Sequence, residues 1–209
     1  MSEEQQKIPS PWLSIWIHPR LTMRRIAERD PDDMIFLLMS FAGFSEILVS
    51  ASRFNLGDRI SIPLIIALAI LLGPVIGFSG MLIASCLFRW TGSWMNGKAS
   101  YAMLRAAIAW SFVPIICFSI MWIPQFFLLG DLLFVSKVVL YGSKPFLIIV
   151  GLNISRLIIV IWSIVIFLAC LCEVQKFPLW KSLLNCIFSA IIFFIAVLFI
   201  AAVIGVTIS

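Results

Sequence analysis

The ionisable side chains that could carry out a reaction are few and lie far apart in the sequence. His18 is the only histidine, so a Ser–His or metal site built around it would lack partners. Asp30, Asp32 and Asp33 form an acidic cluster that is typical of a solvated turn between two helices. Phosphate-binding and nucleophile motifs such as G-x-x-x-x-G-K-[ST] and G-x-S-x-G are absent. We therefore expect no catalytic residue, no metal and no cofactor, and a protein that is not an enzyme.

Two charged residues, Glu46 and Arg156, lie inside long apolar stretches. Arg156 interrupts "GLNISRLIIVIWSIVIF" (151–167), which is apolar almost throughout. Ionisable groups in such stretches often line the path of an ion or substrate, or pair with one another. If both stretches are helices, a rise of about 1.5 Å per residue puts the two residues about 7 Å apart along the membrane normal. An ion pair is one hypothesis; the alternative is independent placement, with Arg156 reaching outward to the headgroups.

Composition identifies the surroundings of these residues. Of 209 residues, 62% are hydrophobic and only 12% are charged, against about 25% charged in soluble domains. Lipid is the natural solvent for so much apolar surface. The sequence therefore predicts an all-α integral membrane protein: a bundle of five transmembrane helices (residues 34–209) after a cytoplasmic N-terminal segment (residues 1–33). The predicted spans are residues 34–51, 62–88, 104–129, 152–173 and 180–207.

The distribution of Lys and Arg predicts the orientation of the bundle. With the N-terminus in the cytoplasm, ten of these residues lie on the inner side and four on the outer side, so we expect the N-terminus inside and the C-terminus outside. The net charge of +5 then reports topology, and no nucleic-acid partner is expected. The inner residues are Lys7, Arg20, Arg24, Arg25, Arg29, Arg89, Lys98, Arg105, Lys176 and Lys181; the outer ones are Arg53, Arg59, Lys137 and Lys144.

Small residues recur in the second predicted span. Gly73 and Gly77 form a GxxxG pattern, which Gly80 and Ala84 continue. Such a stripe allows helices to approach closely, so we expect packing within the bundle. Homodimerisation, or a thin wall beside a substrate path, is the alternative. The five cysteines contain no CxxC pattern and are expected to be small buried hydrophobes.

The segment "SPWLSIWIHPRLTMRRIAERD" (10–30) has the pattern of an amphipathic interfacial helix. Ser10 and Pro11 suit a helix start, and apolar residues then recur at helical spacing. Tryptophan prefers the headgroup level and arginine binds anionic lipid. We therefore expect this segment to bind the cytoplasmic leaflet and its anionic headgroups; docking of a protein partner is the alternative. The residues assigned to the lipid interface are Trp12, Trp16, Arg20, Arg24 and Arg25.

A second group of polar residues is expected at the cytoplasmic surface. Tyr101 and Arg105 lie where the third span enters the membrane, and Glu173 closes the fourth span. By the predicted topology Arg105 and Glu173 are at the same level, which favours an ion pair between them. Alternatively, each faces headgroups and water, where an ion pair contributes only about 0–1 kcal/mol.

Taken in order, the stretches "PWLSIWIHPRLTMRRI" (11–26), "GKASYAMLRAAIAWSFVP" (97–114), "VIWSIVIFLACLCEVQKF" (160–177) and "LWKSL" (179–183) resemble the Yip1 domain family in its bacterial form. The resemblance extends from about residue 10 to the last span. It implies five transmembrane helices, a cytoplasmic N-terminus and a place in the bacterial inner membrane. Eukaryotic members associate with Rab-type GTPases and carry a DLYGP-like motif before the first span. Here that place reads "AERDPDDM" (27–34), so we expect no Rab-type partner.

Two hypotheses for function remain. The first is a non-catalytic membrane scaffold or adaptor that binds lipid and a membrane-protein partner, or a second copy of itself, through its basic cytoplasmic side. The second is a small transporter or channel subunit that uses Glu46 and Arg156. A polar cavity that reaches Glu46 and Arg156 from one side would favour transport, and a sealed bundle would favour the scaffold.

Overall fold

The computed structural model describes residues 10–136 and 143–208, and these residues form helices and turns without any strand. Five helical stretches are long and apolar enough to cross a membrane, which confirms the predicted all-α fold with five spans. The elements in order are α1 (Pro11–Ser14), α2 (Pro19–Arg29), α3 (Ile35–Arg53), η1 (Leu56–Asp58), α4 (Ile62–Ser93), α5 (Tyr101–Ser111), α6 (Val113–Phe118), η2 (Ser119–Met121), α7 (Trp122–Leu129), η3 (Gly130–Phe134), α8 (Ser143–Gln175) and α9 (Leu179–Ile208).

The helix boundaries differ from the predicted spans in two places. The third span is a chain of short helices, α5 to α7, because Pro114 and Pro124 lack the N–H that a continuous helix needs. The fourth span begins at Ser143 instead of residue 152. The side chains of Asn153 and Ser155, near the predicted start, donate to the carbonyls of Ile149 and Gly151 one turn earlier in the helix. Their polar groups are thus satisfied inside the helix.

The N-terminal segment is divided at His18. The residue before a proline avoids the helical conformation, and His18 has φ −125° and ψ 58° ahead of Pro19. Helix α1 therefore ends after one turn, and α2 begins at Pro19. The apolar residues of the segment lie on two short helices and the turn between them, and not on a single helix face.

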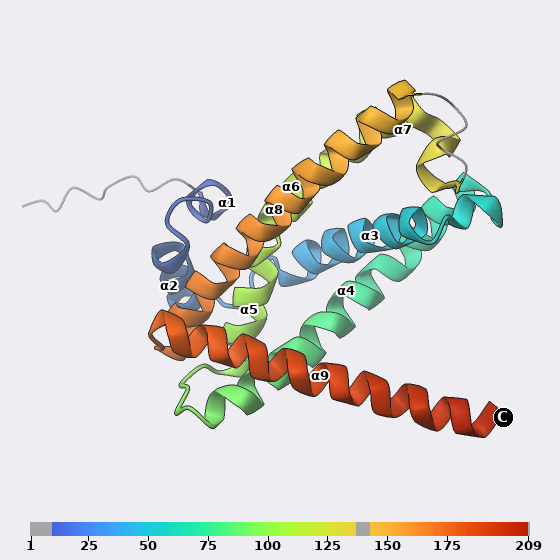
Figure 1. The fold of residues 1–209 in the computed structure, drawn as a ribbon. Coiled ribbons are helices and arrows are strands. Elements are labelled where there is room, and N and C mark those ends of the chain that lie inside the picture. The colour runs from blue at the N-terminus through green and yellow to red at the C-terminus, as the bar shows by residue number, and fades with distance from the viewer. Residues whose placement is uncertain (1–9, 137–142, 209) are drawn as a thin grey trace, which may run out of the picture.

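The five spans run alternately between two ends of the molecule (Figure 1). We call "basal" the end that carries α2, residues 94–100 between α4 and α5, and residues 176–178 between α8 and α9. We call "distal" the end that carries residues 54–61 between α3 and α4 and the turn η3. Helix α8 ends and α9 begins at a common basal corner, from which the two helices diverge (Figure 1). The odd number of spans places the last residues of α9 at the distal end, away from α2.

Helices α3 and α4 are in backbone contact through glycines. A Cβ atom on Gly77 would lie 1.9 Å from the carbonyl oxygen of Met39, and one on Gly43 would lie 1.9 Å from that of Gly73. Any larger residue would push the helices apart. The predicted role of Gly73 and Gly77 in packing within the bundle is therefore confirmed. A Cβ on Gly80 would meet no atom within 4 Å.

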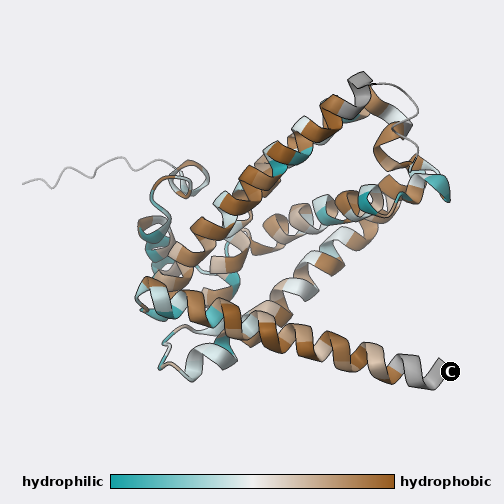
Figure 2. Cartoon of the chain, viewed as in Figure 1, coloured by the Kyte–Doolittle hydropathy of each residue, from teal (hydrophilic) through white to brown (hydrophobic). Residues whose placement is uncertain are grey.

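Two hydrophobic cores hold the helices together. The basal core joins α2, α3, α5 and α8 around Trp110, which is 2% exposed. The distal core joins α3, α4, α7 and η3, where the rings of Trp122 and Phe134 stack 6.0 Å apart. Helix α9 contributes little to either core, since only 6% of its span is buried. Hydrophobic residues line the long helices, whereas hydrophilic ones gather on α2 and in the connections (Figure 2).

Candidate functional site

Ion pairs at the basal end fasten α2 to the bundle. Arg24 donates two hydrogen bonds to the carboxylate of Glu173 on α8, at 2.8 and 3.2 Å. Lys176 donates to the same carboxylate at 2.7 Å. Arg105 on α5 pairs with Asp32 at 2.7 Å. The predicted ion pair between Arg105 and Glu173 is therefore wrong. Helix α2 lies beside the end of α8, so Arg24 of α2 pairs with Glu173 instead.

The backbone at the end of α8 positions Glu173 between its two cations. Lys176 adopts the left-handed conformation with φ 58°, and the N–H of Phe177 bonds to the carbonyl of Cys172. This is the Schellman arrangement that ends a helix abruptly. The side chain of Glu173 is only 10% exposed between its two cations. Its hydrogen bond and its charge raise the pKa of Arg24 above the usual value. Tyr101, the third predicted member of this group, is half exposed and forms no ion pair.

The aromatic residues assigned to lipid lie against the protein. Trp12 makes an edge-to-face contact with Trp110, with ring centres 5.9 Å apart, and Trp16 packs on the same basal core. Arg20 and Arg24 are exposed, and Arg25 borders a basal cleft of about 440 Å³ beside Trp110. The assignment of these five residues to the lipid interface remains a prediction.

The exposed apolar residues of the N-terminal segment were not singled out in the sequence. Leu13 is 65% exposed, Ile17 is 76% exposed and Leu21 is 43% exposed. The buried apolar positions of the segment are Ile15, Met23 and Ile26, which belong to the basal core. The break at His18 divides the segment into two short helices, so its apolar residues could not be sorted into buried and exposed ones from the periodicity of a single helix.

A buried polar network, also unexpected from the sequence, joins α4, α8 and α9 at the basal end. Gln175 is 1% exposed; its amide nitrogen donates to the carbonyl of Phe88, and its oxygen accepts from the N–H of Ala99. Thr91 bonds to both Asn185 and Ser189. The spacing of Asn185 and Ser189, one helical turn apart in an apolar span, is the signal that could have revealed it. Each of these groups has a partner, so the network stabilises the corner from which α8 and α9 diverge.

The predicted intramembrane pair is not formed. Among the described residues, Glu46 and Arg156 take part in no ion pair within 4.0 Å. Glu46 accepts a long hydrogen bond, 3.4 Å, from Ser50 one turn along α3. The two residues instead border the same cavity and interact through their charges at longer range. Arg156 lines the cavity from α8 and Glu46 lines it from α3, so the two residues lie in one region without direct contact.

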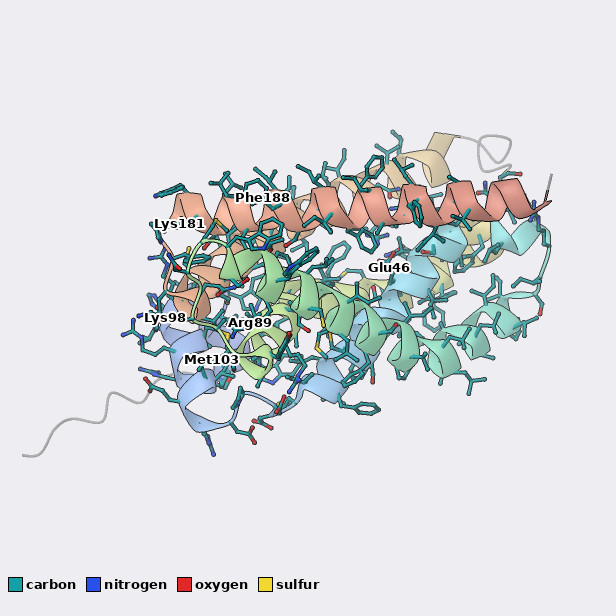
Figure 3. All side chains as sticks on the ribbon, turned by 90° about the horizontal axis from the view of Figure 1, so that it is seen from below. Glu46, Arg89, Lys98, Met103, Lys181 and Phe188 are labelled. Atoms are coloured by element: carbon teal, nitrogen blue, oxygen red, sulfur yellow. The ribbon has the colours of Figure 1, made fainter. Side chains whose placement is uncertain are left out.

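That cavity, which we call the central cleft, has a volume of about 640 Å³ and lies among α3, α4, α5, α6 and α8. Arg53 is a third charged residue at its edge, unpaired within 4.0 Å among the described residues. Ser163 borders the cleft, is 6% exposed, and its hydroxyl has no hydrogen-bond partner in the part of the chain that the structure describes. Figure 3 shows Glu46 well away from the basic residues Arg89, Lys98 and Lys181, which gather at the basal end. The remaining lining residues are mostly apolar and include Ala42, Ala84, Phe88, Ile108, Phe112, Leu157, Val160, Ile164 and Phe167.

Metal and thiol chemistry find no support in the part of the chain that the structure describes. No group of three or more His, Cys, Asp or Glu residues there is arranged to hold a metal ion. All five cysteines are free, and Cys170 and Cys172 are buried. What the arrangement offers is binding: an exposed basic and apolar surface at the basal end, and a cleft with three unpaired charges.

Comparison with known proteins gives one match. The family model described as the Yip1 domain matches residues 13–201, nearly the whole chain. The search of curated proteins and the search of solved structures give no match.

Proposed function

The chain belongs to the Yip1 domain family, and we propose that this multi-pass membrane protein is a non-catalytic scaffold or adaptor. Its N-terminal segment, residues 10–34, would bind the surrounding leaflet and a membrane-protein partner or a second copy. The observation that supports this is the fixed attachment of a segment with an exposed apolar and basic surface. The pairs Arg24–Glu173 and Arg105–Asp32 hold the segment on the bundle, while Leu13, Ile17 and Leu21 remain exposed.

The chemistry of this surface suits an anionic leaflet. Exposed Leu and Ile side chains insert at the headgroup level, and Lys or Arg near an anionic surface contributes about 1 kcal/mol each. Arg20 and Arg24 are exposed beside these apolar residues. We place the segment on the cytoplasmic side of a bacterial inner membrane, since ten of the fifteen Lys and Arg residues fall on that side in the predicted topology.

Photo-crosslinking in intact membranes tests the proposal. A photoreactive residue at Ile17, which is 76% exposed, should form adducts with lipid or with another protein chain. The same residue at Ile15, which is 0% exposed, is the matched control and should react only within the chain. Ile17 adducts no more frequent than those at Ile15 would contradict the proposal.

Orientation is tested separately with a reporter that is active in only one compartment. A reporter that is active only in the cytoplasm, fused after Ser209, should show no activity if the N-terminus is cytoplasmic and five helices span the membrane. Cytoplasmic activity of that fusion would contradict the proposed orientation.

The central cleft favours the second candidate, a small transporter. It contains the two ionisable residues, Glu46 and Arg156, that a sealed bundle would have kept away from any cavity. At its basal side Phe88 and Phe167 pack with ring centres 5.0 Å apart. A transport cycle would have to separate these rings. Proteoliposomes in which the native chain exchanges solute, and in which Glu46→Gln or Arg156→Gln abolishes that exchange, would support this candidate.

A further inference from the structure

The central cleft contains a set of polar groups that the scaffold function does not use. On α3, Glu46 and Arg53 are seven residues apart, which is about two turns and keeps them on one face. On α8, Arg156 and Ser163 have the same spacing. All four residues line the same cleft, and Arg156 interacts through its charge with both Glu46 and Arg53. The cleft therefore combines two cations with a carboxylate and a hydroxyl that can accept hydrogen bonds.

The charged side chains of the cleft form no ion pair among the described residues. Arg53 and Arg156 repel each other and share no carboxylate within 4.0 Å among the described residues. Ser163 is more than nine-tenths buried, and its hydroxyl lacks a partner within residues 10–136 and 143–208. Unpaired charges and unsatisfied hydroxyls in an apolar span are costly unless something else satisfies them. The arrangement calls for a ligand with an anion at one end and a hydrogen-bond-donating cation at the other.

We propose that the central cleft binds a phospholipid with a phosphoethanolamine headgroup. The phosphate lies between the guanidiniums of Arg53 and Arg156. The planar guanidinium suits phosphate because it can donate two parallel hydrogen bonds. The ammonium reaches inward to the carboxylate of Glu46 and the hydroxyl of Ser163. The cleft volume of about 640 Å³ is ample for a headgroup and the first part of its acyl chains.

The lining identifies a lipid as the source of this headgroup. Leu157 and Ile164, which are 59% and 53% exposed, flank the cleft on the outer face of α8. Phe88 and Phe167 close its basal side with apolar surface. Acyl chains can lie along these side chains, whereas a small soluble zwitterion would leave them bare.

Native mass spectrometry of the detergent-purified full chain tests the proposal. Phosphatidylethanolamine should bind more tightly than phosphatidylglycerol, which lacks the ammonium, and phosphatidylcholine, whose methylated nitrogen cannot donate to Glu46. Free phosphoethanolamine should bind at least about tenfold more weakly than the lipid, because it lacks the acyl chains. Equal binding of the three lipids, or of the lipid and the free headgroup, would overturn the proposal.

Matched variants assign the two ends of the headgroup. Arg156→Gln should weaken binding of phosphatidylethanolamine and phosphatidylglycerol alike by about tenfold. Glu46→Gln should remove the preference for phosphatidylethanolamine while leaving phosphatidylglycerol unaffected. Arg59→Gln, on the exposed α3–α4 connection and outside the cleft lining, is the charge-matched control and should leave binding unchanged. A preference for phosphatidylethanolamine that survives Glu46→Gln would contradict the assignment.

A further variant keeps the test decisive if a charge change impairs folding. Leu157→Trp alters an exposed position and fills the cleft without touching any charge. It should reduce binding of all three lipids while the melting temperature in detergent stays close to that of the native chain. Undiminished binding to Leu157→Trp would place the lipid elsewhere.

Discussion

At the basal end, Glu173 lies 2.8 Å from Arg24 and 2.7 Å from Lys176, whereas in the central cleft Glu46 has no cation within 4.0 Å among the described residues. The neighbouring polar groups differ less sharply. Gln175 and Thr91 at the basal end form hydrogen bonds, whereas among the described residues the hydroxyls of Ser163 in the cleft and Ser182 at the basal end, and the indole nitrogen of Trp110, have no partner. Polar groups that satisfy one another stabilise the fold. Polar groups left unsatisfied around a cavity are available to a ligand.

The basal end should therefore be sensitive to mutation and the cleft tolerant of it, as long as no ligand is present. Melting temperature in detergent without added phospholipid measures both. We expect the loss of stability on mutation to be largest in the basal core and smallest in the central cleft.

Trp110→Ala should have the largest effect, because Trp110 is 2% exposed at the centre of the basal core and holds Trp12 of the N-terminal segment. Removing a buried Trp costs about 3–5 kcal/mol. Trp90→Ala, at a site 54% exposed, is the control and should cost little. Equal losses from the two variants would show that the basal core is not the stabilising region.

Gly77→Ala comes next and affects both regions, since it separates α3 from α4. The added Cβ would lie 1.9 Å from the carbonyl oxygen of Met39, and overpacking of this kind costs about 1–3 kcal/mol. Gly80→Ala, three residues further on, meets no atom within 4 Å and should be neutral or slightly stabilising. A Gly77→Ala variant as stable as Gly80→Ala would mean that the helices do not cross at these glycines.

Glu173→Gln should lower stability by about 1 kcal/mol, because it removes the shared partner of two exposed cations. For a chain of this size the melting temperature should fall by about 2–4 °C. Glu28→Gln, which removes an exposed carboxylate with no ion pair within 4.0 Å among the described residues, is the control. The difference between these variants should shrink in high salt, and a difference that persists would rule out an electrostatic origin.

The sequence predicted the elements of this comparison better than their partners. Long apolar runs identified five spans, and the spacing of Gly73 and Gly77 identified a close helix contact, because both properties depend on local composition and periodicity. Partners depend on how helices lie over one another. Arg105 and Glu173 were both predicted at the cytoplasmic surface, and both lie at the basal end. Because α2 lies beside α8, however, Glu173 pairs with Arg24 and Arg105 pairs with Asp32.

The same limit applies to the cleft. The rise per residue gives the depth of Glu46 and Arg156, but it does not give the direction in which each helix face points. Arg53 was assigned only to the outer surface by its charge, although its place two turns beyond Glu46 on one face of α3 was visible in the sequence. The unsatisfied hydroxyl of Ser163 has no local signature, since a serine in a span usually bonds to the preceding turn.

The most direct test of the central claim compares the same substitution in the two regions and adds a double-mutant cycle in the cleft. Glu46→Gln, Arg156→Gln and the double variant are measured beside Glu173→Gln in detergent without phospholipid. We predict that Glu173→Gln alone lowers the melting temperature. Neither cleft variant should lower the melting temperature, and the coupling energy between Glu46 and Arg156 should stay within about 0.5 kcal/mol. A loss at Glu46→Gln as large as at Glu173→Gln, or a coupling well above that size, would contradict the claim that the cleft charges serve a ligand and not the fold.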